Sequence, residues 1–145
     1  MTTDKTKVAI YTRTNQAHEG VEKQLQELRA YCEANGKEIY AEYVDEGVSG
    51  MSMEGRHSLQ RLLEDAKKQE FQEVIIWKIN RLARNVLDVM SIIHKMDSCG
   101  VTLRSIMESI ESSTPIGKFA LQMMAAVTEL ELASGEDDRY DQQTC

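Results

Sequence analysis

Four arginines in three short polar segments are the residues of this sequence best suited to chemistry. They are Arg13 in YTRTN (residues 11–15), Arg56 shortly after DEGVSG (residues 45–50), and Arg81 and Arg84 in KINRLAR (residues 78–84). Arginine binds phosphate through paired hydrogen bonds, and transfer of a phosphoryl group needs positive groups at its oxygens. If the four side chains converge, the sequence predicts a phosphate-binding site.

Each polar segment follows an apolar run that is typical of a buried strand. The runs are residues 7–12, 38–44 and 73–78, and their β-branched and aromatic content favours strands over helices. The carboxyl ends of parallel strands meet at one edge of a sheet, where ligands bind. We therefore expect the three segments and their arginines to lie at that edge.

The remaining elements predict an α/β domain. The expected helices are residues 21–35, 57–69, 86–98 and 115–133, and a fourth strand spans residues 101–106. Strands that alternate with helices form a parallel sheet covered on both faces. We expect a three-layer domain with a mainly parallel four-stranded sheet flanked by helices, and then a long C-terminal helix that Thr114 caps and Pro115 begins.

The last helix is apolar over a wide surface. Ile116, Ala120, Met123, Val127 and Leu130 recur at intervals of three and four residues, and further apolar side chains widen this face. A helix that is apolar this far round must be buried on two sides. The pattern favours a subunit interface of a homodimer or tetramer over residues 115–132; the alternative is an ordinary core helix in which methionine fills gaps.

Composition limits the possible functions. The 145 residues hold about one domain, which we place at residues 1–133, before an acidic tail at 134–145 that we expect to be disordered. The net charge of −7 argues against a strong free-standing nucleic-acid binder, although residues 78–104 are net positive. There is no apolar run long enough for a membrane span and no signal core, and the three cysteines are scattered, which predicts a cytoplasmic protein.

No pattern predicts a cofactor or a metal ion. The sequence contains no Gly-rich P-loop and no GxGxxG, so a nucleotide cofactor has no support. The cysteines, histidines and aspartates do not have the spacing of metal ligands, and His18, His57 and His94 are isolated. We therefore expect no cofactor and no metal.

Several motifs, in order, resemble the catalytic domain of serine recombinases of the resolvase/invertase kind. These are YxR at Tyr11, Gln24 eleven residues after Arg13, DEGxSG followed by Arg56, K-x-(D/N)-R-L-x-R from Lys78, and STPxGKF from Ser113. The similarity runs from about Val8 to Leu132, which is most of the chain.

The resemblance implies a mechanism and a role for each residue. In the family a serine hydroxyl attacks the DNA phosphodiester, forms a 5′-phosphoserine and releases a 3′-hydroxyl, without metal or cofactor, and four subunits exchange strands. Carried onto this chain, Arg13, Arg81 and Arg84 hold the phosphate. Supporting positions are Tyr11, Gln24, Asp45, Ser49, Arg56 and Asn80. The helix from Pro115 forms the dimer contact and approaches the DNA minor groove, and Lys118 is a further DNA contact.

The chain departs from the family pattern at its most important position. The family motif reads YxRVS, and Asn15 stands where the nucleophilic serine is expected. An amide is not a useful oxygen nucleophile. Thr14 carries a hydroxyl but alternates to the other side of the strand from the arginines. Asn80 replaces an aspartate, and Leu132 stands where an arginine is expected.

These departures leave several hypotheses open. The first is a recombinase catalytic domain that keeps the fold and weak affinity for DNA phosphate but does not cleave. The second is a non-catalytic protein that dimerises with an active recombinase and modulates it. An active enzyme that uses Thr14, and a small-molecule phosphotransferase, are weaker alternatives. The sequence does not indicate a target DNA site, or whether the ancestral reaction was resolution, inversion or integration.

Overall fold

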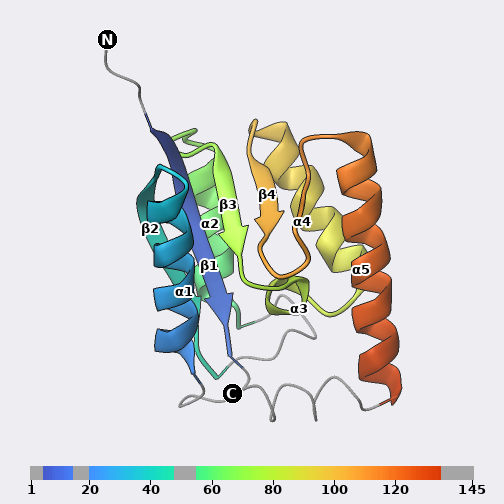
Figure 1. Cartoon of the computed structure of the whole chain (residues 1–145). Coiled ribbons are helices and arrows are strands. Elements are labelled where there is room, and N and C mark those ends of the chain that lie inside the picture. Colours follow the sequence, from blue (N-terminus) through green and yellow to red (C-terminus); the bar gives the residue numbers. More distant parts are fainter. Residues whose placement is uncertain (1–4, 15–19, 48–54, 135–145) are drawn as a thin grey trace.

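The fold is a five-stranded sheet with helices on both faces (Figure 1). The computed structural model describes residues 5–14, 20–47 and 55–134. In chain order its elements are β1 (Thr6–Arg13), α1 (Val21–Ala34), β2 (Lys37–Asp45), α2 (His57–Ala66), β3 (Glu73–Ile76), α3 (Ile79–Leu82), α4 (Val86–Ser98), β4 (Thr102–Ser105), β5 (Ile110–Glu111) and α5 (Pro115–Ser134). The strand order is β2-β1-β3-β4-β5; the first four strands are parallel, and β5 is antiparallel to β4.

Strand β1 separates two apolar layers. Successive side chains of a strand point to opposite faces of the sheet. Val8 and Ile10 accordingly pack with the buried side of α1, whereas Ala9 and Tyr11 pack with residues of α2 and α4 on the other face. All four side chains are completely buried. The predicted three-layer α/β fold is thereby confirmed.

Two short elements differ from the prediction. The sheet has a fifth strand, β5, because the chain turns back after β4 and pairs Ile110 with Ser105 before α5 begins. The polar break expected after the third strand contains the short helix α3, whose four residues are all buried. Neither element is long enough to produce a periodic sequence pattern.

The long helix α5 begins where the sequence predicts. Thr114 Oγ1 accepts a hydrogen bond from the Gly117 backbone N–H at 3.1 Å, which is the contact of an N-cap residue. The helix packs on α3, α4 and β5. Within residues 5–14, 20–47 and 55–134, no helix has both the length and the apolar character needed to cross a bilayer. Most of the expected tail, residues 135–145, lies outside the described residues.

Helix α5 has two separate faces. Its inner face buries Leu121, Ala125 and Thr128. Its outer face exposes a stripe of large apolar residues: Ile116, Phe119, Met123, Val127 and Leu130. We call these five residues the outer stripe. The apolar residues that the sequence places around most of this helix therefore fall into two groups. One group packs in the domain core, and the other is exposed.

Candidate phosphate-binding site

The predicted site residues gather at the carboxyl edge of the parallel strands. Tyr11 and Arg13 lie at the end of β1, Asp45 is the last residue of β2, and α3 with Arg81 follows β3. Figure 1 shows α3 directly beyond the tip of β3, below the sheet in this view. This is the edge at which open parallel sheets bind ligands.

The Asp45 carboxylate joins three parts of this edge. Its Oδ2 accepts a hydrogen bond from the Tyr11 hydroxyl at 2.8 Å. Its two oxygens also accept the backbone N–H groups of Ser58 and Leu59, at 2.9 and 3.1 Å. These N–H groups belong to the first turn of α2, which lacks a side-chain cap of its own. Asp45 therefore acts as the cap of α2 and fixes that helix to β1.

Arg56 lies completely buried beside Tyr11. Its Nη2 donates to the Tyr11 hydroxyl at 2.8 Å and to the Arg81 carbonyl at 3.2 Å, and the guanidinium carbon is 5.5 Å from the centre of the Tyr11 ring. Burial raises the pKa of Tyr11 more than the Arg56 charge lowers it, so the phenol stays protonated. Arg56 Nε and Nη1 meet no hydrogen-bond acceptor within the described residues.

Arg13 and α3 hold each other in place. Arg13 Nη2 donates to the carbonyl of Asn80 at 2.7 Å, and Arg81 Nη1 donates to the carbonyl of Arg13 at 3.4 Å. The Arg13 side chain is fully buried, and Arg81 and Arg84 are each 4% exposed. The short helix α3 thus places Arg81 against the end of β1.

The four guanidinium groups repel one another. The pKa of Arg13 is lowered to about 9, first by burial and then by the charges of Arg84, Arg56 and Arg81. Arg13 is still a cation at neutral pH. Nearby like charges disfavour the charged form, and an anion placed among them would relieve this. The arrangement is therefore suited to holding an anion such as a phosphate.

Three polar contacts support the rim of the site. The Thr12 hydroxyl donates to Gln24 Oε1 of α1, which ties Gln24 to β1. Thr14 is buried, and its hydroxyl accepts the Gly47 N–H at 3.4 Å. The Thr14 backbone N–H donates to the Asp45 carbonyl at 3.1 Å.

The structure gives no position for two of the predicted residues and places a third elsewhere. Asn15 and Ser49 lie outside the described residues, so their placement stays a prediction. Lys118 forms an ion pair with Asp97 at 2.6 Å. This pair joins the first turn of α5 to the last turn of α4, at the end of the sheet opposite α3 (Figure 1).

Sequence reasoning missed Glu108, which holds α3. Glu108 Oε1 accepts the Ile79 N–H at the start of α3 at 3.1 Å and also accepts the Ser105 hydroxyl. Glu108 follows β4, and residues that follow the parallel strands lie at the carboxyl edge of the sheet. Its position after a strand was therefore the signal that could have identified it. Among the residues that the structure describes, no group of three His, Cys, Asp or Glu side chains has metal-binding geometry.

The family of the chain follows from comparison with known proteins. Residues 8–138 match the family model described as resolvase, N-terminal domain. The chain belongs to the resolvase family. This resolvase domain is similar to the N-terminal catalytic domain of TP901-1 integrase, with 31% identity, a TM-score of 0.75, and coverage of 89% of this chain and 98% of that one. The predicted resemblance to serine recombinases is confirmed.

Further relatives of the resolvase domain agree with this assignment. A resolvase-family site-specific recombinase from Streptococcus pneumoniae has 31% identity and a TM-score of 0.72, with coverage of 97% of this chain and 99% of that one. Serine recombinase gin of Escherichia phage Mu is 32% identical over 76 residues, which are 52% of this chain and 38% of that protein.

A probable DNA-invertase, y4cG of Sinorhizobium fredii, matches more of the resolvase domain. It is 33% identical over 123 residues, which are 85% of this chain and 37% of that protein. The chain therefore spans well under half the length of these two curated relatives.

Proposed function

We propose that this resolvase domain binds a DNA backbone phosphate and does not cleave the strand. Arg13, Arg81 and Arg84 bind the phosphate, and Arg56 and Tyr11 order them. The observation that carries the proposal is the cluster of four buried arginines at the carboxyl edge of the sheet. No metal or cofactor is needed for binding, because the guanidinium groups supply the positive charge.

The missing cleavage follows from the residue at the nucleophile position. Asn15 stands where the family has its serine, and an amide cannot be activated by losing a proton near neutral pH. The alternative in which the Thr14 hydroxyl acts as the nucleophile has little support, since this hydroxyl is turned toward the Gly47 N–H. A small-molecule phosphotransferase is disfavoured by the family assignment.

An adduct assay tests this proposal. The protein is incubated with supercoiled and short duplex DNA, and covalent protein–DNA species are sought on denaturing gels. We expect none from the natural sequence and none from Thr14→Ala. Asn15→Ser is expected to produce a phosphoserine adduct, and Arg84→Met in that background should abolish it. An adduct formed by the natural sequence, and lost in Thr14→Ala, would contradict the proposal.

The outer stripe of α5 supports an oligomer as part of the proposed function. Five large apolar side chains on one exposed helix face are unusual for a monomer. We propose that two copies pair through this face, as a dimer or within a tetramer, and that the end of α5 lies near the DNA. Binding to DNA is expected to be weak, because the chain has a net charge of −7. A cytoplasmic location belongs to the same proposal, since DNA is the ligand.

A second candidate function uses the same helix. The outer stripe could pair with the α5 helix of an active recombinase, and a subunit without a nucleophilic serine would then lower the activity of the mixed assembly. Co-expression with an active relative, followed by crosslinking and size-exclusion chromatography, tests this. Absence of mixed dimers would exclude it. Lys118 stays a separate prediction, because its ion pair with Asp97 lies away from the arginines.

A further inference from the structure

A cleft beside the arginine cluster has no role in the function described so far. It measures about 210 Å³ and lies between α1 and the segments that follow β3 and β4. Its lining consists of Gly20, Lys23, Gln24, Glu27, Trp77, Arg81 and Met107. Arg81 is therefore shared between the cleft and the phosphate-binding cluster.

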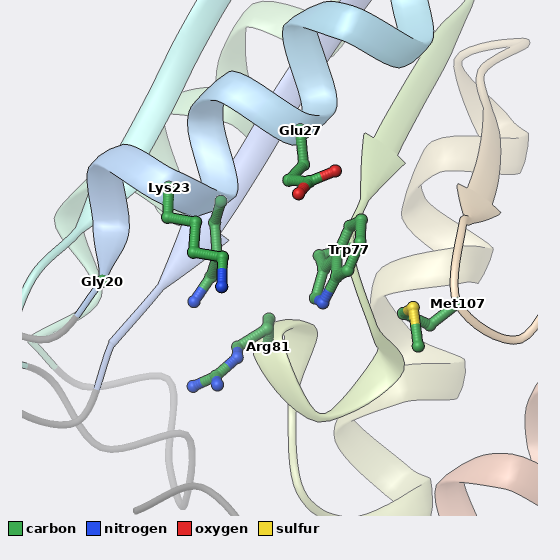
Figure 2. A pocket seen from close by; sticks show the side chains of 7 residues that line it. Gly20, Lys23, Glu27, Trp77, Arg81 and Met107 are labelled. Atoms are coloured by element: carbon green, nitrogen blue, oxygen red, sulfur yellow. The ribbon is translucent and has the colours of Figure 1, made fainter. Parts of the chain in front are cut away.

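The cleft combines an aromatic wall with two cations. Trp77 is half-buried and presents its ring to the cleft, and Met107, 55% exposed, lies on its far side (Figure 2). Lys23 and Arg81 lie on the other side of Trp77, and the carboxylate of Glu27 lies above Trp77, away from Arg81 (Figure 2). The end of the cleft near Lys23 and Arg81 is thus suited to an anion, and the part near Trp77 to a flat ring.

The size of the cleft limits the ligand. A volume of about 210 Å³ is smaller than the roughly 300 Å³ at which sites for drug-sized ligands begin. It has room for one ring system and not for a dinucleotide. Bases stack on aromatic side chains in proteins that bind single-stranded nucleic acid, and lysine and arginine hold their phosphates.

We propose that this cleft binds one nucleotide, with its base against Trp77 and its phosphate between Lys23 and Arg81. The choice of a nucleotide rests on the proposed function, in which DNA is the ligand. A nucleotide in a DNA strand and a free mononucleotide share this chemistry. In a strand, the base would leave its stack and enter the cleft while Arg81 contacts the adjoining phosphate.

Trp77 makes the test direct, because it is the only tryptophan of the chain. Deoxyadenosine 5′-monophosphate is titrated into the protein while Trp77 fluorescence is followed. We expect saturable quenching, with deoxyadenosine and deoxyribose 5-phosphate each binding at least about tenfold more weakly, since each lacks one half of the contact. Equal binding of deoxyribose 5-phosphate, or no saturable change with the nucleotide, would overturn the proposal.

Variants assign the signal to the cleft. Lys23→Met removes one cation from an exposed helix position and should weaken nucleotide binding roughly fivefold, as expected for one charged hydrogen bond at a solvent-accessible site. The matched control is Lys68→Met, also an exposed lysine, whose partner is Asp65 of α2. The control should bind like the natural sequence. Equal affinity of Lys23→Met and the control would overturn the proposal.

Two further measurements distinguish a nucleotide in a DNA strand from a free mononucleotide, and the cleft from the proposed function. A single-stranded oligonucleotide should quench Trp77 more strongly than a fully paired duplex, because only its bases are free to enter. Arg84→Met should weaken duplex binding, measured by anisotropy, and leave mononucleotide quenching unchanged. Quenching without any duplex binding would overturn the proposed function alone; duplex binding without quenching would overturn the cleft alone.

Discussion

At the scale of single residues, Asp45 connects β1, β2 and α2 within the site. One carboxylate accepts hydrogen bonds from Tyr11 and from two backbone N–H groups of α2. A carboxylate at a helix N-terminus is further stabilised by the helix dipole. Because Asp45 is only 5% exposed, water does not replace these contacts when they are lost.

Replacement of Asp45 by asparagine is expected to destabilise the domain. The substitution removes the charge and turns one acceptor oxygen into a donor that faces existing donors. We expect a loss of about 1–3 kcal/mol in the free energy of unfolding, measured with urea. Asp97→Asn, which removes an ion pair from the surface, is the control and should lose less than about 1 kcal/mol. Equal losses would contradict the role given to Asp45.

The lowered pKa of Arg13 makes anion binding dependent on pH. Burial and the neighbouring arginines lower the pKa of Arg13 to about 9 in the free protein, and a bound anion must raise this pKa because it favours the charged form. Affinity for sulfate, whose charge is constant in this range, should therefore be flat at neutral pH. It should fall as the pH rises through 9, by at most about tenfold per pH unit. Isothermal calorimetry at several pH values measures this.

Arg13→Met is the comparison for the sulfate experiment. This variant should bind sulfate more weakly at neutral pH. Its sulfate affinity should also no longer fall as the pH rises through 9, because the titrating group is absent. Both proteins are measured in the same buffers, so that the difference between them reports the removal of Arg13. A step of the same size in the variant would show that Arg13 does not contact the anion.

The residues of the site were predictable to different degrees. Tyr11, Arg13 and Asp45 lie at the carboxyl ends of strands and the other arginines follow strands, so their common location is predictable from sheet topology. The contact of Arg13 with the Asn80 carbonyl depends on the short helix α3, which the sequence does not indicate. Glu108 was missed because a single acidic residue after a strand is most often a solvated surface charge.

At the scale of elements, α3 depends on a carboxylate outside it. A four-residue helix has too few internal hydrogen bonds to be stable alone. Glu108 supplies an acceptor for its first N–H, and α3 in turn supplies the carbonyl to which Arg13 donates. The position of Arg81 therefore rests on the turn between β4 and β5.

Two substitutions of Glu108 test this dependence. Glu108→Ala removes the acceptor of the Ile79 N–H and should lower the free energy of unfolding by about 1–2 kcal/mol and weaken sulfate binding several-fold. Glu108→Gln keeps a carbonyl oxygen and should fall between Glu108→Ala and the natural sequence in both measurements. Glu108→Ala with unchanged sulfate affinity would show that α3 is held in place without it.

The long elements were predictable and the short ones were not. The strand before Arg13 and the helix from Pro115 carry enough residues for their periods to be read, and their ends agree with the structure to within a residue or two. α3 and β5 contain four and two residues. Such elements are fixed by tertiary contacts, here Glu108 for α3 and Ser105 for β5.

At the scale of the whole molecule, the outer stripe of α5 should control association. Phe119→Lys combined with Val127→Lys places two charges in the proposed subunit interface, and we expect a monomer by sedimentation velocity. The matched control is Gln122→Lys, an exposed position of the same helix outside the stripe. It should associate like the natural sequence. A double variant with unchanged sedimentation would contradict pairing through this face.

The order of strands in the sheet also has a consequence during protein synthesis. β1 pairs with both β2 and β3, yet β3 begins only at residue 73. At translation rates of about 5–20 residues per second, the edge of β1 that pairs with β3 stays unpaired for several seconds after β1 is synthesised. An unpaired apolar strand is a template for aggregation. We therefore expect nascent chains of this protein to depend on chaperones until β3 has left the ribosome.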